Sequence, residues 1–82
     1  MDKTALAQQL RQAEEHVARG EIYLRRQRRI IELLEQPGSH AAAAAAKALL
    51  EDFETSQNRL IAHRDRIERL LAELSEKAVS IS

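Results

Sequence analysis

The chain has 82 residues, no cysteine, and 13 basic against 13 acidic side chains, so its formal net charge is zero. Charged residues make up 32% of the chain and aromatic residues only 2%, which is typical of long helices and coiled coils rather than of a β-rich core. This composition excludes disulfides and thiolate metal sites, and the charge balance provides no overall field that would select nucleic acid or an anionic membrane.

The first predicted element is a helix over residues 3–36. Either Asp2 or Thr4 can cap its N-terminus through a side-chain oxygen. A Pro-Gly-Ser sequence at 37–39 is the strongest break in an otherwise helix-forming chain, and it predicts a short turn there.

The second predicted helix covers residues 39–77. Ser39 is expected to cap it, and the alanines at 41–46 are the strongest helix formers available. Residues 78–82 are expected to form a frayed tail. A turn this short brings two helices together in opposite directions, so the chain is predicted to fold as one domain.

Each predicted helix carries a seam of mostly apolar residues at alternating spacings of three and four, as in a coiled coil. The predicted seam of the first helix comprises Leu6, Leu10, Ala13, Val17, Gly20, Leu24, Gln27, Ile31 and Leu34. The predicted seam of the second comprises Ala42, Ala46, Leu49, Phe53, Ser56, Leu60, His63, Ile67, Leu70 and Leu74. In antiparallel register the two seams stay in phase, so the sequence predicts an all-α, antiparallel two-helix coiled-coil hairpin.

Several apolar residues fall outside these seams. They are Ile22, Tyr23, Ile30, Leu33, Leu50, Ile61 and Leu71. Scattered exposed apolar residues are common in soluble proteins, so one interpretation is that these residues have no role. A hairpin of this size has a thin core, however, and the surplus is better explained by association of two copies into a four-helix bundle. We therefore expect a homodimer, with another protein as a possible partner through this set.

The most conspicuous charged feature is a basic run formed by Arg25, Arg26, Arg28 and Arg29. An arginine strip on a helix can bind phosphates, which makes a nucleic-acid-associated regulator the alternative function. The simpler interpretation is a solvated helical face, because acidic residues lie one turn away and no aromatic residues are interleaved for base stacking.

Few features of the sequence indicate metal binding, ligand binding or catalysis. His16, His40 and His63 lack the spacing of a zinc site, although His16 and His63 are expected at similar heights and His63 is expected to pack against Ala13. Gly20 in mid-helix indicates either a notch for a ligand or a close approach of the helices. We expect no cofactor, no metal and no enzymatic activity.

No signal peptide or membrane-spanning segment is recognisable, so a cytoplasmic location without membrane contact is expected.

The chain resembles a group of small, uncharacterised proteobacterial helical-hairpin proteins. The resemblance follows His16 to Glu21, Arg26-Gln27, Ile30-Ile31, Leu34-Glu35, Leu49-Leu50, Phe53-Glu54, Ser56-Gln57 and His63 to Arg66. Tyr23 stands where that group has a histidine, and the alanine run at 41–46 departs from its pattern. The resemblance implies a helical hairpin and assigns no functional residue. The expected function is a self-associating interaction or structural module.

Overall fold

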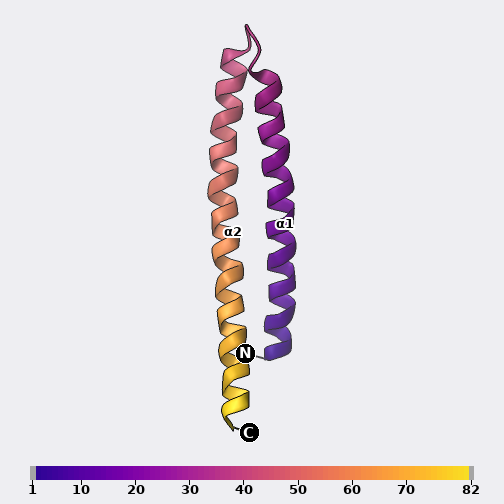
Figure 1. Cartoon of the computed structure of the whole chain (residues 1–82), viewed down its shortest axis with the longest axis vertical. Helices are drawn as coiled ribbons and strands as arrows, with labels where there is room; N and C mark the ends of the chain where they lie inside the picture. Colours follow the sequence, from indigo (N-terminus) through magenta and orange to yellow (C-terminus); the bar gives the residue numbers. More distant parts are fainter. Residues whose placement is uncertain (1, 82) are drawn as a thin grey trace.

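The computed structural model describes the backbone of residues 2–81 and the side chains of residues 2–77. Two helices, α1 (Lys3–Leu34) and α2 (His40–Ile81), lie side by side in opposite directions and form a rod of 68 × 15 × 14 Å (Figure 1). The described residues contain no strand. The prediction of an all-α helical hairpin is therefore confirmed.

Capping and a glycine turn determine where α1 begins and ends. The Asp2 carboxylate accepts a hydrogen bond of 3.2 Å from the Thr4 backbone N–H, so Asp2 is the N-cap. The helix ends at Leu34, two residues before the predicted end, and the Glu35 N–H still donates to the Ile31 carbonyl at 3.0 Å. Gly38 has a φ of 92°, a left-handed conformation that favours glycine and lets the chain reverse here.

The second helix begins one residue after the predicted start. Ser39 directly precedes it, and the Ser39 carbonyl accepts a hydrogen bond of 2.9 Å from the Ala43 N–H. The helix continues to Ile81, beyond the predicted end at residue 77, so the backbone is helical over 78–81 where a frayed tail was expected. Ser82 lies outside the described residues.

The predicted seam of α1 is confirmed. Six of its members are buried, namely Leu6, Ala13, Val17, Leu24, Gln27 and Ile31. The other three are half-buried, namely Leu10, Gly20 and Leu34. The spacing of three and four along α1 therefore identifies the stripe that faces α2.

The predicted seam of α2 is wrong at every second position. The observed seam comprises Ala43, Ala46, Leu50, Phe53, Gln57, Leu60, Arg64, Ile67, Leu71 and Leu74. The positions between the correctly predicted ones are shifted by one residue, so Ala42, Leu49, Ser56, His63 and Leu70 are exposed. The sequence misleads because Leu49-Leu50 and Leu70-Leu71 are apolar doublets, and either member of a doublet satisfies the pattern.

His63 is consequently exposed, and the prediction that it packs against Ala13 is wrong. Ala13 instead belongs to a buried cluster with Leu6 and Ile67, and Leu71 packs against that cluster. The seam position next to His63 is held by half-buried Arg64.

The Arg64 guanidinium bonds the Asp65 carboxylate at 3.0 and 3.1 Å. This hydrogen bond raises the pKa of Arg64 above its ordinary value. The aliphatic part of Arg64 can therefore cover the seam while its charge stays paired at the edge.

Neighbouring leucines test the observed register. Leu71→Ala is expected to lower the free energy of unfolding by about 1–3 kcal/mol, because Leu71 packs against the buried cluster. Leu70→Ala is expected to change it by less than about 0.5 kcal/mol, because Leu70 is exposed. Urea unfolding of dilute protein, followed by circular dichroism, measures both. Equal losses, or a larger loss at Leu70, would contradict the register.

Candidate functional site

Two buried glutamines join the helices in the middle of the hairpin. Gln27 Nε2 donates to the Ala46 carbonyl and Gln57 Nε2 donates to the Val17 carbonyl, each at 2.8 Å. Their exposed fractions are only 6% and 4%. Each glutamine comes from one helix and binds a carbonyl of the other, so this pair, here called the glutamine clasp, fixes how far the helices can slide along each other.

Gly20 provides the space for one half of the clasp. A Cβ placed on Gly20 would collide with the side-chain amide of Gln57. The Gln57 Oε1 atom is buried against this glycine and has no hydrogen-bond partner within the described residues. Of the two interpretations of Gly20, the geometry supports close approach of the helices, because the Gln57 amide takes the room that the missing side chain leaves.

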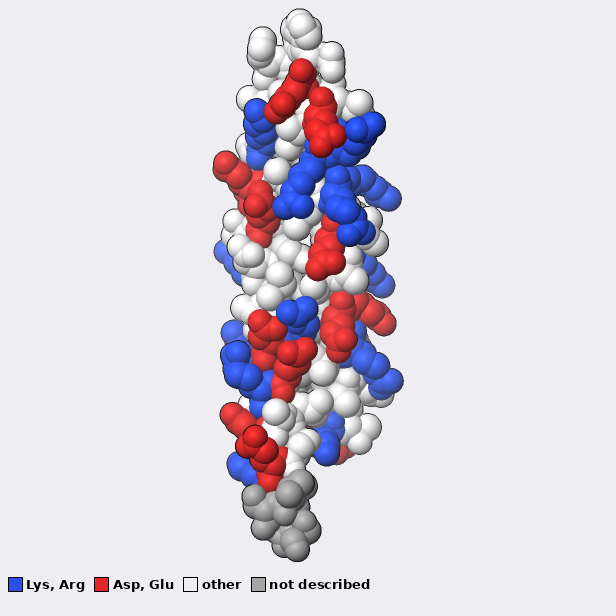
Figure 2. Space-filling model, viewed as in Figure 1, with Lys and Arg blue, Asp and Glu red and all other residues white. Residues whose placement is uncertain are grey.

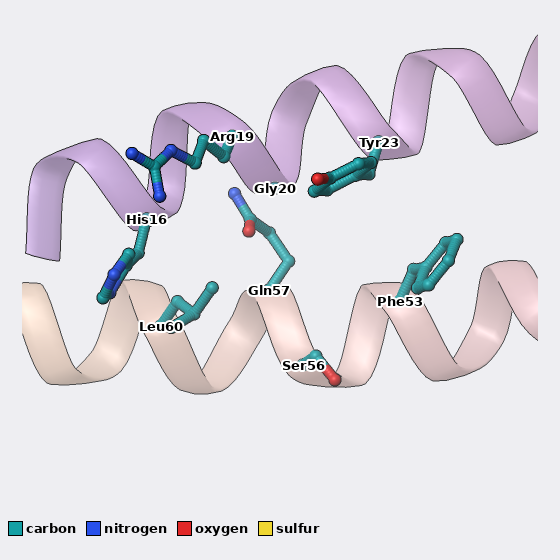
Figure 3. A pocket seen from close by; sticks show the side chains of 8 residues that line it. All are labelled: His16, Arg19, Gly20, Tyr23, Phe53, Ser56, Gln57 and Leu60. Atoms are coloured by element: carbon teal, nitrogen blue, oxygen red, sulfur yellow. The ribbon is translucent and has the colours of Figure 1, made fainter.

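An open hollow of about 320 Å³ lies beside the clasp, halfway along the rod. Its lining comprises His16, Arg19, Gly20, Tyr23, Phe53, Ser56, Gln57 and Leu60 (Figure 3). The rings of Tyr23 and Phe53 meet across the helices with their centroids 6.4 Å apart and tilted by 34°. The hollow thus has apolar walls from both helices, while Arg19 of α1 places a positive charge at its edge and the His16 ring lies beside it.

The seams divide the hairpin surface into two long faces. We call one of them the Tyr23 face. It consists of inner positions, which lie directly beside the seams, and of rim positions, each three residues after an inner position and further from the seam. Its inner positions are Gln9, His16, Tyr23 and Ile30 on α1 and Leu49, Ser56, His63 and Leu70 on α2. His16, Tyr23 and Ser56 line the same hollow, which confirms that these positions of the two helices share one face.

The opposite face lies on the other side of the two seams from Tyr23, and we call it the Glu35 face. Glu35 of α1 and Lys47 of α2 both lie there, and their charged groups form an ion pair of 3.0 Å between the helices. The two faces are therefore distinct surfaces of the same rod.

The exposed large apolar residues are concentrated on the Tyr23 face. They are Ile22, Tyr23, Ile30, Leu33, Leu49 and Leu70. All of these except Ile22, which lies on the outer side of α1, are at inner or rim positions of the Tyr23 face. Leu33 and Tyr23 are the most exposed, at 58% and 53%. An apolar stripe therefore runs along a face that the hairpin itself leaves uncovered.

The predicted association set is divided by the structure. Ile22, Tyr23, Ile30 and Leu33 are exposed, whereas Leu50 and Leu71 lie in the seam of α2. Ile61 is half-buried and lies on the Glu35 face. The sequence analysis assigned Leu49 and Leu70 to the interior, and so it missed them as surface residues. The signal for them was present in the two leucine doublets.

The basic run at 25–29 does not form one patch. Arg25 and Arg28 lie on the Glu35 face, Arg26 lies on the rim of the Tyr23 face, and Arg29 lies on the outer side of α1. Arg29 also forms an ion pair of 3.2 Å with Glu32, one turn along the helix. Figure 2 shows one long face, where acidic and basic side chains alternate along both helices.

The charges nevertheless differ between the two faces. The rim of the Tyr23 face carries four arginines, Arg19, Arg26, Arg59 and Arg66, against two carboxylates, Asp52 and Glu73. The acidic residues of the Glu35 face are Glu14, Glu21, Glu32, Glu35, Glu51, Glu54, Asp65 and Glu68, against basic residues Arg11, Arg25, Arg28 and Lys47. A chain with zero net charge therefore presents one basic face and one acidic face.

The histidines are exposed, and two of them share the Tyr23 face. His16 and His63 occupy inner positions there, while His40 is the first residue of α2. Over the described residues, no three potential His, Cys, Asp or Glu ligands come together to hold a metal ion. Neither helix, as far as it is described, has an apolar stretch long enough to cross a membrane.

The chain matches no protein-family model, no curated protein and no solved structure. The resemblance to small proteobacterial proteins stays a prediction.

A double-mutant cycle tests the clasp. Gly20→Ala is expected to destabilise the hairpin by about 1 kcal/mol, because displacement of the Gln57 amide costs more than the ~1 kcal/mol that alanine gains over glycine in a helix. In a Gln57→Ala background, the same substitution is expected to stabilise by about 1 kcal/mol.

Chemical unfolding of the four proteins of this cycle gives both values. An effect of Gly20→Ala with the same sign in both backgrounds would show that Gly20 is not there to accommodate Gln57.

Proposed function

We propose that the hairpin is a non-enzymatic self-association module, in which two copies pack Tyr23 face against Tyr23 face as a four-helix bundle. The observation that carries this proposal is the uncovered apolar stripe. Tyr23 occupies an inner position midway along the hairpin, Ile30 and Leu49 occupy inner positions nearer the turn, and Leu70 occupies one near the other end. Burial of such side chains against a second copy is favourable by about 25 cal/mol per Å² of apolar surface.

The thin interior of a single hairpin supports the same proposal. Its buried apolar residues are Leu6, Ala13, Val17, Leu24, Ile31, Ala43, Ala46 and Ile67. Three of these eight are alanines, which bury little surface. Chains of this size commonly gain the missing stability from oligomerisation, disulfides or metals, and this chain has no cysteine.

The Tyr23 face also has the dimensions and the polarity of an interface. The length and width of the rod give a long face on the order of 1,000 Å², and a standard protein–protein interface buries about 800 Å² per partner. The inner positions between Gln9 and Leu70 carry no carboxylate, lysine or arginine. Covering this stripe therefore buries no carboxylate, lysine or arginine charge.

Catalysis and phosphate binding are less well supported. His16 and Ser56 both line the hollow, but the Ser56 side chain points away from α1 in Figure 3, so the two do not form a nucleophile–base pair. The alternative of nucleic-acid binding through Arg25 to Arg29 would need these side chains on one surface, and they lie on three different sides of α1.

The oligomeric state tests the proposal. At micromolar concentration, light scattering is expected to give twice the 9.3 kDa mass of the chain. Ile30→Glu with Leu49→Glu is expected to give a monomer, because both substitutions introduce charges into the apolar stripe. The matched control is Ala18→Glu with Ala44→Glu, which adds the same charges on exposed positions of the Glu35 face and is expected to stay dimeric.

Circular dichroism of each variant confirms that the helices are retained. A wild-type monomer throughout the micromolar range, or a dimer that tolerates the two glutamates in the stripe, would refute self-association through this face.

A further inference from the structure

The Tyr23 face carries a charge pattern that the association of two copies does not use. Arg19, Arg26, Arg59 and Arg66 stand along its rims, and none of them pairs with a carboxylate in the part of the chain that the structure describes. Over residues 9–33 and 45–77 together, Asp52 and Glu73 are the carboxylates on this face, against the four arginines. The centre of the groove between the helices therefore combines the apolar Tyr23, Ile30, Leu49 and Leu70 with polar side chains, and arginines stand along both of its edges.

A second copy fits this pattern incompletely. Arg19 and Arg59 flank the contact of Gly20 with Gln57 and so lie at the same height on the two helices. Packing two such faces together brings two basic rims into one interface, and like charges that face each other lower affinity. The rims are complementary to acidic groups, which a second copy offers there only at Asp52 and, near the far end of the rod, at Glu73.

We propose that the Tyr23 face also binds an amphipathic helix of another protein, one that carries carboxylates on both flanks of its apolar stripe. The apolar side chains of such a helix would lie over the hollow between Tyr23, Phe53 and Leu60. Its carboxylates would meet the arginine rims, whose members are seven residues apart on each helix of the hairpin, about 10.5 Å. Acidic residues two turns apart on the bound helix match this spacing.

A helix suits this surface better than a nucleic acid does. The centre of the groove includes the Tyr23–Phe53 ring contact and exposed apolar side chains, which need an apolar occupant to be covered. A phosphate backbone would satisfy the rims and leave the apolar stripe exposed. The bound helix would compete with the second copy for the same face.

Designed peptides test the charge preference directly. Each probe is a labelled amphipathic peptide of about 20 residues, long enough to form a helix. One has a leucine stripe flanked by glutamates, and the matched control has the same stripe flanked by lysines. In fluorescence anisotropy with dilute full-length protein, the glutamate peptide is expected to bind at least about tenfold more tightly than the lysine peptide. Added salt should reduce this difference in affinity between the two peptides, because ions screen the charges.

Charge reversal of the rims locates the binding site. Arg19→Glu with Arg59→Glu is expected to abolish or invert the preference between the two peptides, since Arg19 lines the hollow and Arg59 stands on the opposite rim at the same height. The matched control is Arg25→Glu with Arg28→Glu, which makes the same charge change on the Glu35 face and is expected to keep the preference. Circular dichroism shows whether each variant keeps its helices.

Three outcomes would overturn the proposal. The first is equal binding of the two peptides to the wild type. The second is an equal loss of preference in the rim variant and in the Glu35-face control. The third is a DNA duplex that binds more tightly than the glutamate peptide and is released by the rim substitutions, which would assign the arginines to phosphates.

This inference and self-association fail separately. A protein that is monomeric by light scattering but distinguishes the peptides would refute self-association and support the acidic helix. A dimer that binds both peptides equally would support self-association and refute the binding of an acidic helix.

Discussion

Two helices in contact can bury only one stripe of each, and this constraint governs the rest of the molecule. The hairpin has a single seam on each helix, and its interior is filled largely by small or medium side chains. Everything else must lie on one of two long faces or on the outer sides of the helices. Large apolar residues that would be interior in a bundle of more helices, such as Ile30 and Leu49, therefore stand at the surface.

Within that seam, the buried polar residues determine alignment more than they determine stability. The hydrogen bond from Gln57 to the Val17 carbonyl requires this glutamine, and not the neighbouring Ser56, to face α1. Because α2 turns as one body, the same choice places Leu50 and Leu71 inside and Leu49 and Leu70 outside. A single buried amide thus contributes to deciding which leucines the surface displays, in the way that buried polar residues set register in coiled coils.

The sequence is sufficient for the topology and for α1, where the seam is the one stripe that stays mostly apolar from Leu6 to Leu34 and the Pro37-Gly38 break marks the turn. It is not sufficient for the rotation of α2 about its axis, because the leucine doublets make two neighbouring stripes equally apolar. The hydrogen bond between Gln57 and the Val17 carbonyl removes that ambiguity. A pattern of apolar residues cannot reveal such a long-range bond. The segregation of charge between the two faces was hidden for the same reason, since it becomes visible only when the rotation of α2 is known.

That segregation has a consequence for the behaviour of the protein in solution. A rod with zero net charge and an isoelectric point near 6.8 has little overall electrostatic repulsion to keep its copies apart at neutral pH. A single, unassociated hairpin does have a transverse dipole, because arginines predominate on the rim of its Tyr23 face and acidic residues predominate on its Glu35 face. In dilute buffer such rods attract one another side against opposite side, whereas ions at physiological strength screen the attraction over about 8 Å. The unassociated hairpin is thus a polarised rod whose solubility should increase when salt is added.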